Sequence, residues 1–189
     1  MIALIDCGSN KVRDISRIIE RSTTVQIIGL HDINYKVLNQ YNGVVISGAP
    51  ILLTEINPLP YMNSFEWVKG YSKPILGICF GHQILGLQYG AQITPMAEDR
   101  QLHEIILKKK DPLFDGLAQK VFMQEDHCEH ITVPKGFNLL ASSKSCNNEA
   151  MKHKKKPHYG VQFHPEVSSS GGELLINNFV VLALKESKC

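Results

Sequence analysis

The chain has 189 residues, of which 43% are hydrophobic and 20% charged, and its formal net charge is +2. This composition is typical of a globular domain and argues against disorder, collagen and coiled coils. The charge is too small to indicate a nucleic-acid partner, and no run of about 18 apolar residues is present for a membrane span. We therefore expect a single domain over residues 1–189 that binds neither nucleic acid nor a membrane.

Cysteine usage and the first ten residues both predict a cytoplasmic protein. The five cysteines are scattered and odd in number, which fits a reducing compartment better than a disulfide framework. The segment MIALIDCGSN has no basic leader and carries Asp6 within its apolar stretch, so we expect no signal peptide. Two basic clusters, at residues 108–110 and 152–156, are interpreted as solvated turns rather than as a docking patch.

The first half of the chain alternates between apolar segments of strand length and segments with helical periodicity. Strands are predicted for residues 2–6, 25–30, 43–47 and 74–79. Helices are predicted from residue 12 onward, for residues 61–71, and for residues 81–89 with Gly90 closing the last one. This alternation predicts βαβ units and a parallel sheet that helices cover on both faces.

The second half begins with a different pattern. Between about residues 92 and 141 the apolar segments are shorter, and they predict an antiparallel extension beside the main sheet. Residues 158–163 return to a strand pattern, and residues 172–184 are apolar enough for a C-terminal covering helix. The fold class is therefore α/β, with an open, mostly parallel sheet flanked by helices and a small antiparallel β extension.

The segment GICFG at residues 77–81 lies between a predicted buried strand and a predicted helix. It has the form of a nucleophile elbow, in which small residues on either side permit a tight turn that exposes the central side chain. The helix N-terminus behind Cys79 favours its thiolate and leaves the N–H of Phe80 free to bind a developing oxyanion. A buried cysteine at the end of a strand fits the same five residues.

A base for such a thiolate is present in QFHPE at residues 162–166. His164 can leave the sheet there, and Pro165 stiffens the exit so that Glu166 can orient the imidazole. Ligands of doubly wound sheets bind at the carboxyl ends of the strands, where Cys79 and His164 both fall. Taken alone, FHPE also fits a loop whose histidine and glutamate have no partner.

Three motifs together resemble the class I, triad-type glutamine amidotransferases. They are GICFGHQ around Cys79, GVQFHPEV around His164, and the turn SGAP at residues 47–50, which taken alone is an ordinary turn. The resemblance covers nearly the whole chain and implies a Rossmann-like open sheet. It also implies hydrolysis of L-glutamine to glutamate and ammonia through a γ-glutamyl thioester, without a cofactor or a metal ion.

The resemblance assigns a role to each matching residue. Cys79 would be the nucleophile, His164 the general base and acid, and Glu166 the residue that orients His164. Backbone N–H groups of Gly48, Ala49 and Phe80 would form the oxyanion hole. Gln83 would contact the substrate glutamine, and His82 is interpreted as a structural residue of the elbow.

Within the family, the N-terminal DCGS and the motif FHPEV are most similar to the glutaminase portions of GMP synthetases. Chorismate-utilising relatives more often have FHPES. The ATP-pyrophosphatase half of GMP synthetases needs an SGGVDS-type loop and several hundred more residues, which this sequence lacks. The resemblance therefore implies a synthetase subunit in trans that uses the ammonia, for synthesis of GMP from XMP.

Two segments depart from the family pattern. Ala49 stands where the family usually has glycine, and a methyl group there is costly only if the backbone φ is positive. Residues 124–128 read QEDHC where the GMP-synthetase branch has a Ser-His-x-Asp-like motif. The run DHCEH at residues 126–130 lacks the spacing of known zinc motifs, so we interpret it as a polar surface loop rather than a metal site.

The remaining residues singled out have structural interpretations. Four cysteines are expected to be structural or exposed bystanders, namely Cys7, Cys128, Cys146 and Cys189. Phe65 and Trp67 are expected to contribute to packing rather than to a ligand site.

Three alternative functions stay open from the sequence. The chain could serve another ammonia acceptor, such as a chorismate-type one, or act alone as a Cys-His γ-glutamyl hydrolase. It could also be a non-catalytic interaction module, for which an intact Cys79, His164 and Glu166 would have no physical need.

Overall fold

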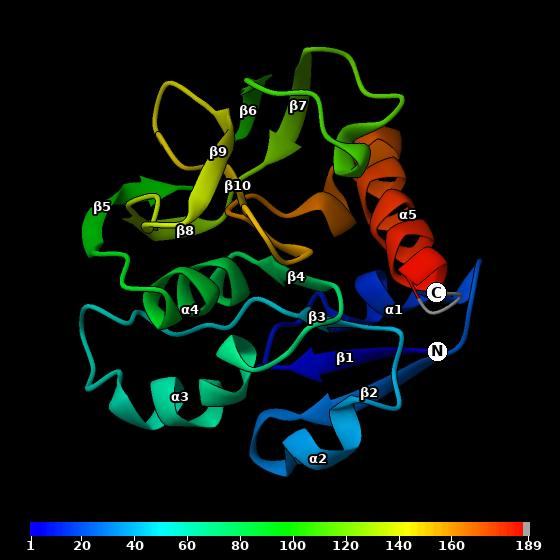
Figure 1. Ribbon diagram of the computed structural model, residues 1–189. Coiled ribbons are helices and arrows are strands. Elements are labelled where there is room, and N and C mark those ends of the chain that lie inside the picture. The colour runs from blue at the N-terminus through cyan, green and yellow to red at the C-terminus, as the bar shows by residue number, and fades with distance from the viewer. Residues whose placement is uncertain (187–189) are drawn as a thin grey trace.

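A nine-stranded mixed sheet forms the centre of the computed structural model, which describes residues 1–186 (Figure 1). Within these residues the strand order is β2-β1-β3-β4-β11-β10-β9-β6-β7. The first part of this order is parallel and consists of β1 (Ile2–Asp6), β2 (Val25–Gly29), β3 (Gly43–Ile46), β4 (Ile75–Ile78) and β11 (His158–Val161). The antiparallel part consists of β6 (Leu102–Leu107), β7 (Lys120–Gln124), β9 (Phe137–Ser142) and β10 (Ala150–His153). A separate antiparallel pair is formed by β5 (Ile93–Asp99) and β8 (His127–Ile131).

Helices cover both faces of the parallel part, as the alternation of strands and helices predicts. The helices are α1 (Val12–Glu20), α2 (Tyr35–Leu38), α3 (Leu59–Ser64), α4 (Phe80–Gln88) and α5 (Ser169–Glu186). In β1, Ile2 and Leu4 pack into the core under α1 and α5, whereas Ala3 and Ile5 pack into the core on the side of α4. Alternate side chains of a fully buried strand thus supply both cores, which explains its continuous apolar sequence.

The α/β fold class is confirmed, with two differences in detail. Strands β6, β7, β9 and β10 do not pack beside the main sheet but extend it, because β10 pairs directly with β11. The helix expected at residues 61–71 is divided into α3 and a short 3-10 turn at Glu66–Lys69. Phe65 leaves helical geometry between them (φ −113°, ψ 12°) and buries its ring completely, so its expected packing role is confirmed.

The parallel part brings three chain segments to one edge of the sheet. The strands β3, β4 and β11 are hydrogen-bonded neighbours, and the N–H of Cys79 donates to the carbonyl of Val161 at 2.9 Å. The turn after β3, the elbow after β4 and the segment after β11 therefore meet at the carboxyl ends of these strands. Among residues 1–186, no helix combines the length and the hydropathy that crossing a bilayer requires.

Candidate active site

Cys79 occupies a strained turn between β4 and α4. Its backbone has φ 51° and ψ −105°, a conformation that non-glycine residues rarely adopt. A Cβ atom at Gly77 would collide with the backbone of Gly81, and one at Gly81 would collide with the carbonyl group of Ile46. The two glycines of GICFG are therefore needed for close backbone approach. Because α4 begins at Phe80, the N–H of Phe80 is one of the donors that have no acceptor within the helix.

His164 and Glu166 form a buried pair directly after β11. His164 Nδ1 lies 2.7 Å from Glu166 Oε1, and the two side chains are 4% and 0% exposed. The backbone N–H of His164 donates to the carbonyl of Gln124 at 2.8 Å, which fixes the histidine where it leaves the sheet. Burial alone would lower the pKa of His164, but the Cys79 thiol and the Glu166 carboxylate outweigh it and raise the pKa to about 10. His164 is therefore protonated at neutral pH.

The turn after β3 lies against both of these elements. A Cβ atom added to Gly48 would be 3.1 Å from His164 Cε1 and 3.8 Å from Cys79 Cβ, so only glycine leaves the imidazole its full space. Among residues 1–186, positive φ at non-glycine residues is confined to Cys79 and Ser169. The backbone of Ala49 is therefore not in the region that requires glycine, and its methyl group causes no strain there.

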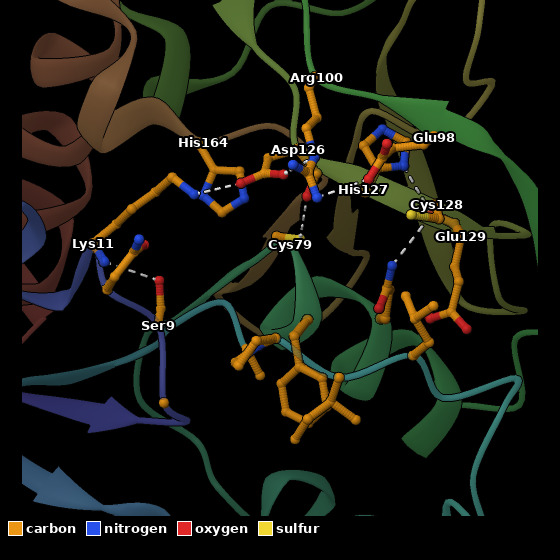
Figure 2. Close-up of a pocket in the computed structure, with 18 residues that line it drawn as sticks. Ser9, Lys11, Cys79, Glu98, Arg100, Asp126, His127, Cys128, Glu129 and His164 are labelled. Atoms are coloured by element: carbon orange, nitrogen blue, oxygen red, sulfur yellow. Dashed lines mark hydrogen bonds and ion pairs between the residues drawn. The ribbon is translucent and has the colours of Figure 1, made fainter.

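The three segments border a pocket of about 600 Å³ (Figure 2). Five of the residues expected at the site line it, namely Ala49, Cys79, Phe80, Gln83 and His164, whereas Gly48 and Glu166 lie behind its lining. The Gln83 amide donates from Nε2 to the backbone carbonyl of Glu129 at 3.2 Å and to Gln162 Oε1 at 3.4 Å. The structure thus brings the residues of all three motifs to one cavity, while their chemical roles stay predictions.

A chain of ion pairs, which the sequence motifs do not predict, also lies along this pocket. Lys11 Nζ is 2.6 Å from Asp126 Oδ2, and Arg100 contacts both Asp126 at 3.4 Å and Glu98 at 2.7 Å. The backbone carbonyl of Asp126 lies 3.8 Å from Cys79 Sγ, and the charged side chains line the same pocket as Cys79 (Figure 2). The pocket that contains Cys79 therefore also holds charged groups of both signs, which are paired with one another.

The interpretation of residues 126–130 as a polar surface loop is wrong. Residues 127–131 form strand β8, in which alternate residues are buried: His127, Glu129 and Ile131 are 5%, 1% and 2% exposed. The period-two alternation of HCEHI is the one local signal in the sequence that indicates this strand. No group of three potential metal ligands is found among residues 1–186.

The bystander cysteines differ in their surroundings. Cys128 lines the pocket, so it is not a bystander by position, whereas Cys7 and Cys146 are buried elsewhere. Burial raises the pKa of Cys7 to about 12 and raises that of Cys146 as well. Both thiols are therefore protonated and unreactive at neutral pH. Cys189 lies outside the described residues.

Three buried acid and imidazole groups lie close together at the start of β8. His127 Nε2 is 3.1 Å from Glu125 Oε2, and both side chains are almost fully buried. Burial and the neighbouring Glu125 carboxylate raise the pKa of Glu149 to about 9, so Glu149 is protonated at neutral pH. A carboxyl pair that retains one proton avoids placing two negative charges together in the protein interior.

Glu149→Gln should stabilise the protein progressively as the pH rises. The pKa of Glu149 in the folded state, about 9, lies above the unfolded value near 4.5, so the wild type loses stability between these pH values. Glutamine is neutral throughout and removes this loss. We expect the thermal midpoint of Glu149→Gln, relative to wild type, to increase from pH 5 to pH 9 in thermal unfolding measurements. A difference that is independent of pH would contradict the assignment of the proton to Glu149.

The chain is similar in sequence to a known protein family and to individual known proteins. The profile of the glutamine amidotransferase class-I family matches residues 3–183. The glutamine-hydrolysing GMP synthase subunit of Pyrococcus abyssi is 34% identical over 190 residues, covering 96% of this chain and 98% of the relative. The corresponding GMP synthase subunit of Methanocaldococcus jannaschii is 34% identical, covering 94% and 95%.

Solved structures agree with these matches. A crystal structure from Thermoplasma acidophilum, described as a subunit of GMP synthase, superimposes with a TM-score of 0.91 at 27% identity and covers 99% of this chain and 95% of its own. A glutamine amidotransferase from Thermotoga maritima has a TM-score of 0.74 at 18% identity, covers 98% and 84%, and supports the fold alone.

Proposed function

The chain belongs to the glutamine amidotransferase class-I family, and from this premise we propose that it hydrolyses L-glutamine and supplies the ammonia to a separate synthetase subunit for synthesis of GMP from XMP. One observation carries the proposal: Cys79 and the His164–Glu166 pair meet in a pocket at the carboxyl ends of β4 and β11. The similarity to glutamine-hydrolysing subunits of GMP synthases, over nearly the full length of both chains, supports this choice of acceptor.

The first half of the reaction forms a thioester. The Cys79 thiolate attacks the γ-carboxamide carbon of glutamine, and the carbonyl oxygen becomes an oxyanion. The N–H groups of Phe80 and of the turn at Gly48 and Ala49 stabilise that charge. The imidazolium of His164 then gives its proton to the leaving nitrogen, the C–N bond breaks, and ammonia departs.

The second half regenerates the enzyme. His164, now neutral, takes a proton from a water molecule whose oxygen attacks the thioester carbon. The C–S bond breaks, the new γ-carboxyl group loses its proton to solvent as glutamate leaves, and the Cys79 thiolate and the His164 imidazolium are restored. The 2.7 Å contact of Glu166 with His164 Nδ1 holds the imidazole in the orientation that both proton transfers need.

The ionic groups of the pocket suit the other end of the substrate. Glutamine carries an α-ammonium and an α-carboxylate, and the pocket contains Asp126 and Glu98 beside Lys11 and Arg100. Gln83 borders the same cavity and would contact the bound glutamine. We place the reaction in the cytoplasm, which the free thiols of Cys7, Cys79, Cys128 and Cys146 support.

The test measures both products of the paired reaction. Glutamate release from L-glutamine is measured for the chain alone and with an ATP-pyrophosphatase synthetase subunit, ATP and XMP, while GMP formation is followed in parallel. We expect glutamine-dependent GMP formation with about one glutamate released for each GMP. Faster cleavage of γ-glutamyl peptides than of glutamine would favour the stand-alone hydrolase. The absence of glutamate release under every condition would rule out the proposed activity.

A further inference from the structure

The carboxylate of Glu129 on β8 has no part in the chemistry described above, although it is only 1% exposed. All three hydrogen bonds to it come from one loop. The N–H of Leu53 donates to Oε2 at 3.0 Å, and the N–H and hydroxyl of Thr54 both donate to Oε1 at 2.6 Å. A buried carboxylate is costly unless donors satisfy it, so this loop and Glu129 stabilise each other.

The loop that Glu129 binds is the continuation of the turn proposed as an oxyanion hole. Residues 50–54 follow Gly48 and Ala49 directly, and the first three of them line the pocket. Two backbone N–H groups of residues 48–54, those of Leu53 and Thr54, donate to acceptors elsewhere in the described residues 1–186. Both donate to Glu129. The backbone of the turn is therefore tied to the wall of the pocket through a single carboxylate.

The backbone of Glu129 is connected to helix α4, which also lines the pocket. Its carbonyl accepts hydrogen bonds from Gln83 Nε2 at 3.2 Å and from His127 Nδ1 at 2.9 Å. Gln83 lies on α4, the helix that begins directly after Cys79. Glu129 thus links the loop after β3, strand β8 and the helix of the nucleophile elbow, which are three of the elements that line the pocket (Figure 2).

We propose that Glu129 is a positioning residue that clamps residues 50–54 and thereby holds the N–H groups of the Gly48–Ala49 turn in place for the oxyanion. This inference rests on the proposed glutaminase function. The clamp acts on the transition state, since the oxyanion forms only there, whereas Gln83 and the ionic groups of the pocket stay in place to bind the ground state. Loss of the clamp should therefore lower kcat far more than it raises KM.

Three variants remove different numbers of the hydrogen bonds between Glu129 and the loop. Glu129→Ala removes all three hydrogen bonds, and we expect kcat to fall about 100-fold with KM within about threefold of wild type. Glu129→Gln keeps one oxygen but turns an NH₂ group toward an N–H donor, and should lower kcat about 10-fold. Thr54→Val removes only the hydroxyl donor and should have the smallest effect. Asp111→Asn is the control, because the Asp111 side chain is 8% exposed, pairs with Lys152 and accepts from the N–H of Leu113 in a loop outside the pocket.

Two reagents separate positioning from general loss of structure. Iodoacetamide alkylates Cys79 by displacement of iodide and forms no oxyanion, whereas a chloromethyl ketone analogue of glutamine places its carbonyl oxygen in the oxyanion hole. In Glu129→Ala we expect the ketone reaction to slow about 100-fold, with the iodoacetamide rate within about threefold of wild type. Equal slowing of both reactions would overturn the inference, because it would show a general disruption of the site.

Hydrogen exchange tests the clamp without any catalysis. The N–H groups of Leu53 and Thr54 should exchange at least about 10-fold faster in Glu129→Ala than in wild type. In Asp111→Asn their exchange rates should equal those of wild type. Unchanged exchange at both amides in Glu129→Ala would refute the clamp. Failure of the proposed function can be distinguished from failure of the clamp. If the proposed function is wrong, the wild-type protein releases no glutamate, whereas hydrogen exchange still tests the role of Glu129.

Discussion

Replacement of Cys79 by alanine is expected to lower glutamate release by at least about 10⁴-fold, because no other group can form the thioester. The change should leave the fold intact. Besides its interaction with His164, the sulfur has weak polar contacts with Gln162 Nε2 at 3.7 Å and the Asp126 carbonyl at 3.8 Å. Alanine adopts the strained backbone of this position no less easily than cysteine does. The free energy of unfolding should fall by about 1 to 3 kcal/mol, mainly because the interaction with His164 is lost.

Glutamate assays and thermal unfolding check this expectation, with two controls. Cys128→Ala removes the other cysteine that lines the pocket and should retain glutaminase activity. Ammonium salts added to Cys79→Ala and the synthetase subunit should restore GMP formation, since they bypass glutamine hydrolysis. Undiminished glutamate release by Cys79→Ala would show that the proposed nucleophile is wrong.

The parallel half of the fold and its three motifs were predictable because each signal is local. Strands β1, β3 and β4 are short apolar runs, and each motif follows directly after a strand end. A strand end in a parallel sheet specifies its side of the sheet, so Cys79 and His164 could be placed near each other although 85 residues separate them. The glycines of the elbow have an equally local cause, since a turn this tight leaves no room for a side chain at Gly77 or Gly81.

The other wall of the pocket was not predictable in the same way. Whether Glu129 is buried depends on Leu53 and Thr54, which are about 75 residues away in the chain and supply its donors. Lys11 meets Asp126 only because the loop after β1 faces the beginning of β8. Polar residues usually indicate surface, and no local pattern shows that distant donors satisfy them in the interior.

Residues 124–128, which depart from the family pattern, contain a buried pair in the structure. Glu125 and His127 lie 3.1 Å apart, and both side chains are almost fully buried. Because polar residues usually indicate surface, the residue letters alone do not reveal that these two side chains are buried together.

Substitutions of His164 and Glu166 should separate the base from the residue that orients it. His164→Ala removes the group that carries both protons, so kcat should fall at least about 10⁴-fold. Glu166→Gln keeps the shape and leaves the imidazole in place, and should lower kcat about 10²- to 10³-fold. Steady-state glutaminase assays measure both values. A greater loss in Glu166→Gln than in His164→Ala would contradict the assigned roles.

The pH dependence of activity and of stability provides a second test of His164 and Glu166. His164 has a folded-state pKa of about 10, raised above its ordinary value of 6.5 by Cys79 and Glu166 against the effect of burial. Its contribution to stability is complete below about pH 6.5 and is lost as the pH rises through about 10. Since the imidazolium must protonate the leaving ammonia, activity should persist to the same alkaline limit. Glu166→Gln removes one of the groups that raise this pKa, so its alkaline limit of activity and its loss of thermal stability should both move to lower pH. Identical alkaline limits in wild type and Glu166→Gln would show that the carboxylate does not stabilise the imidazolium.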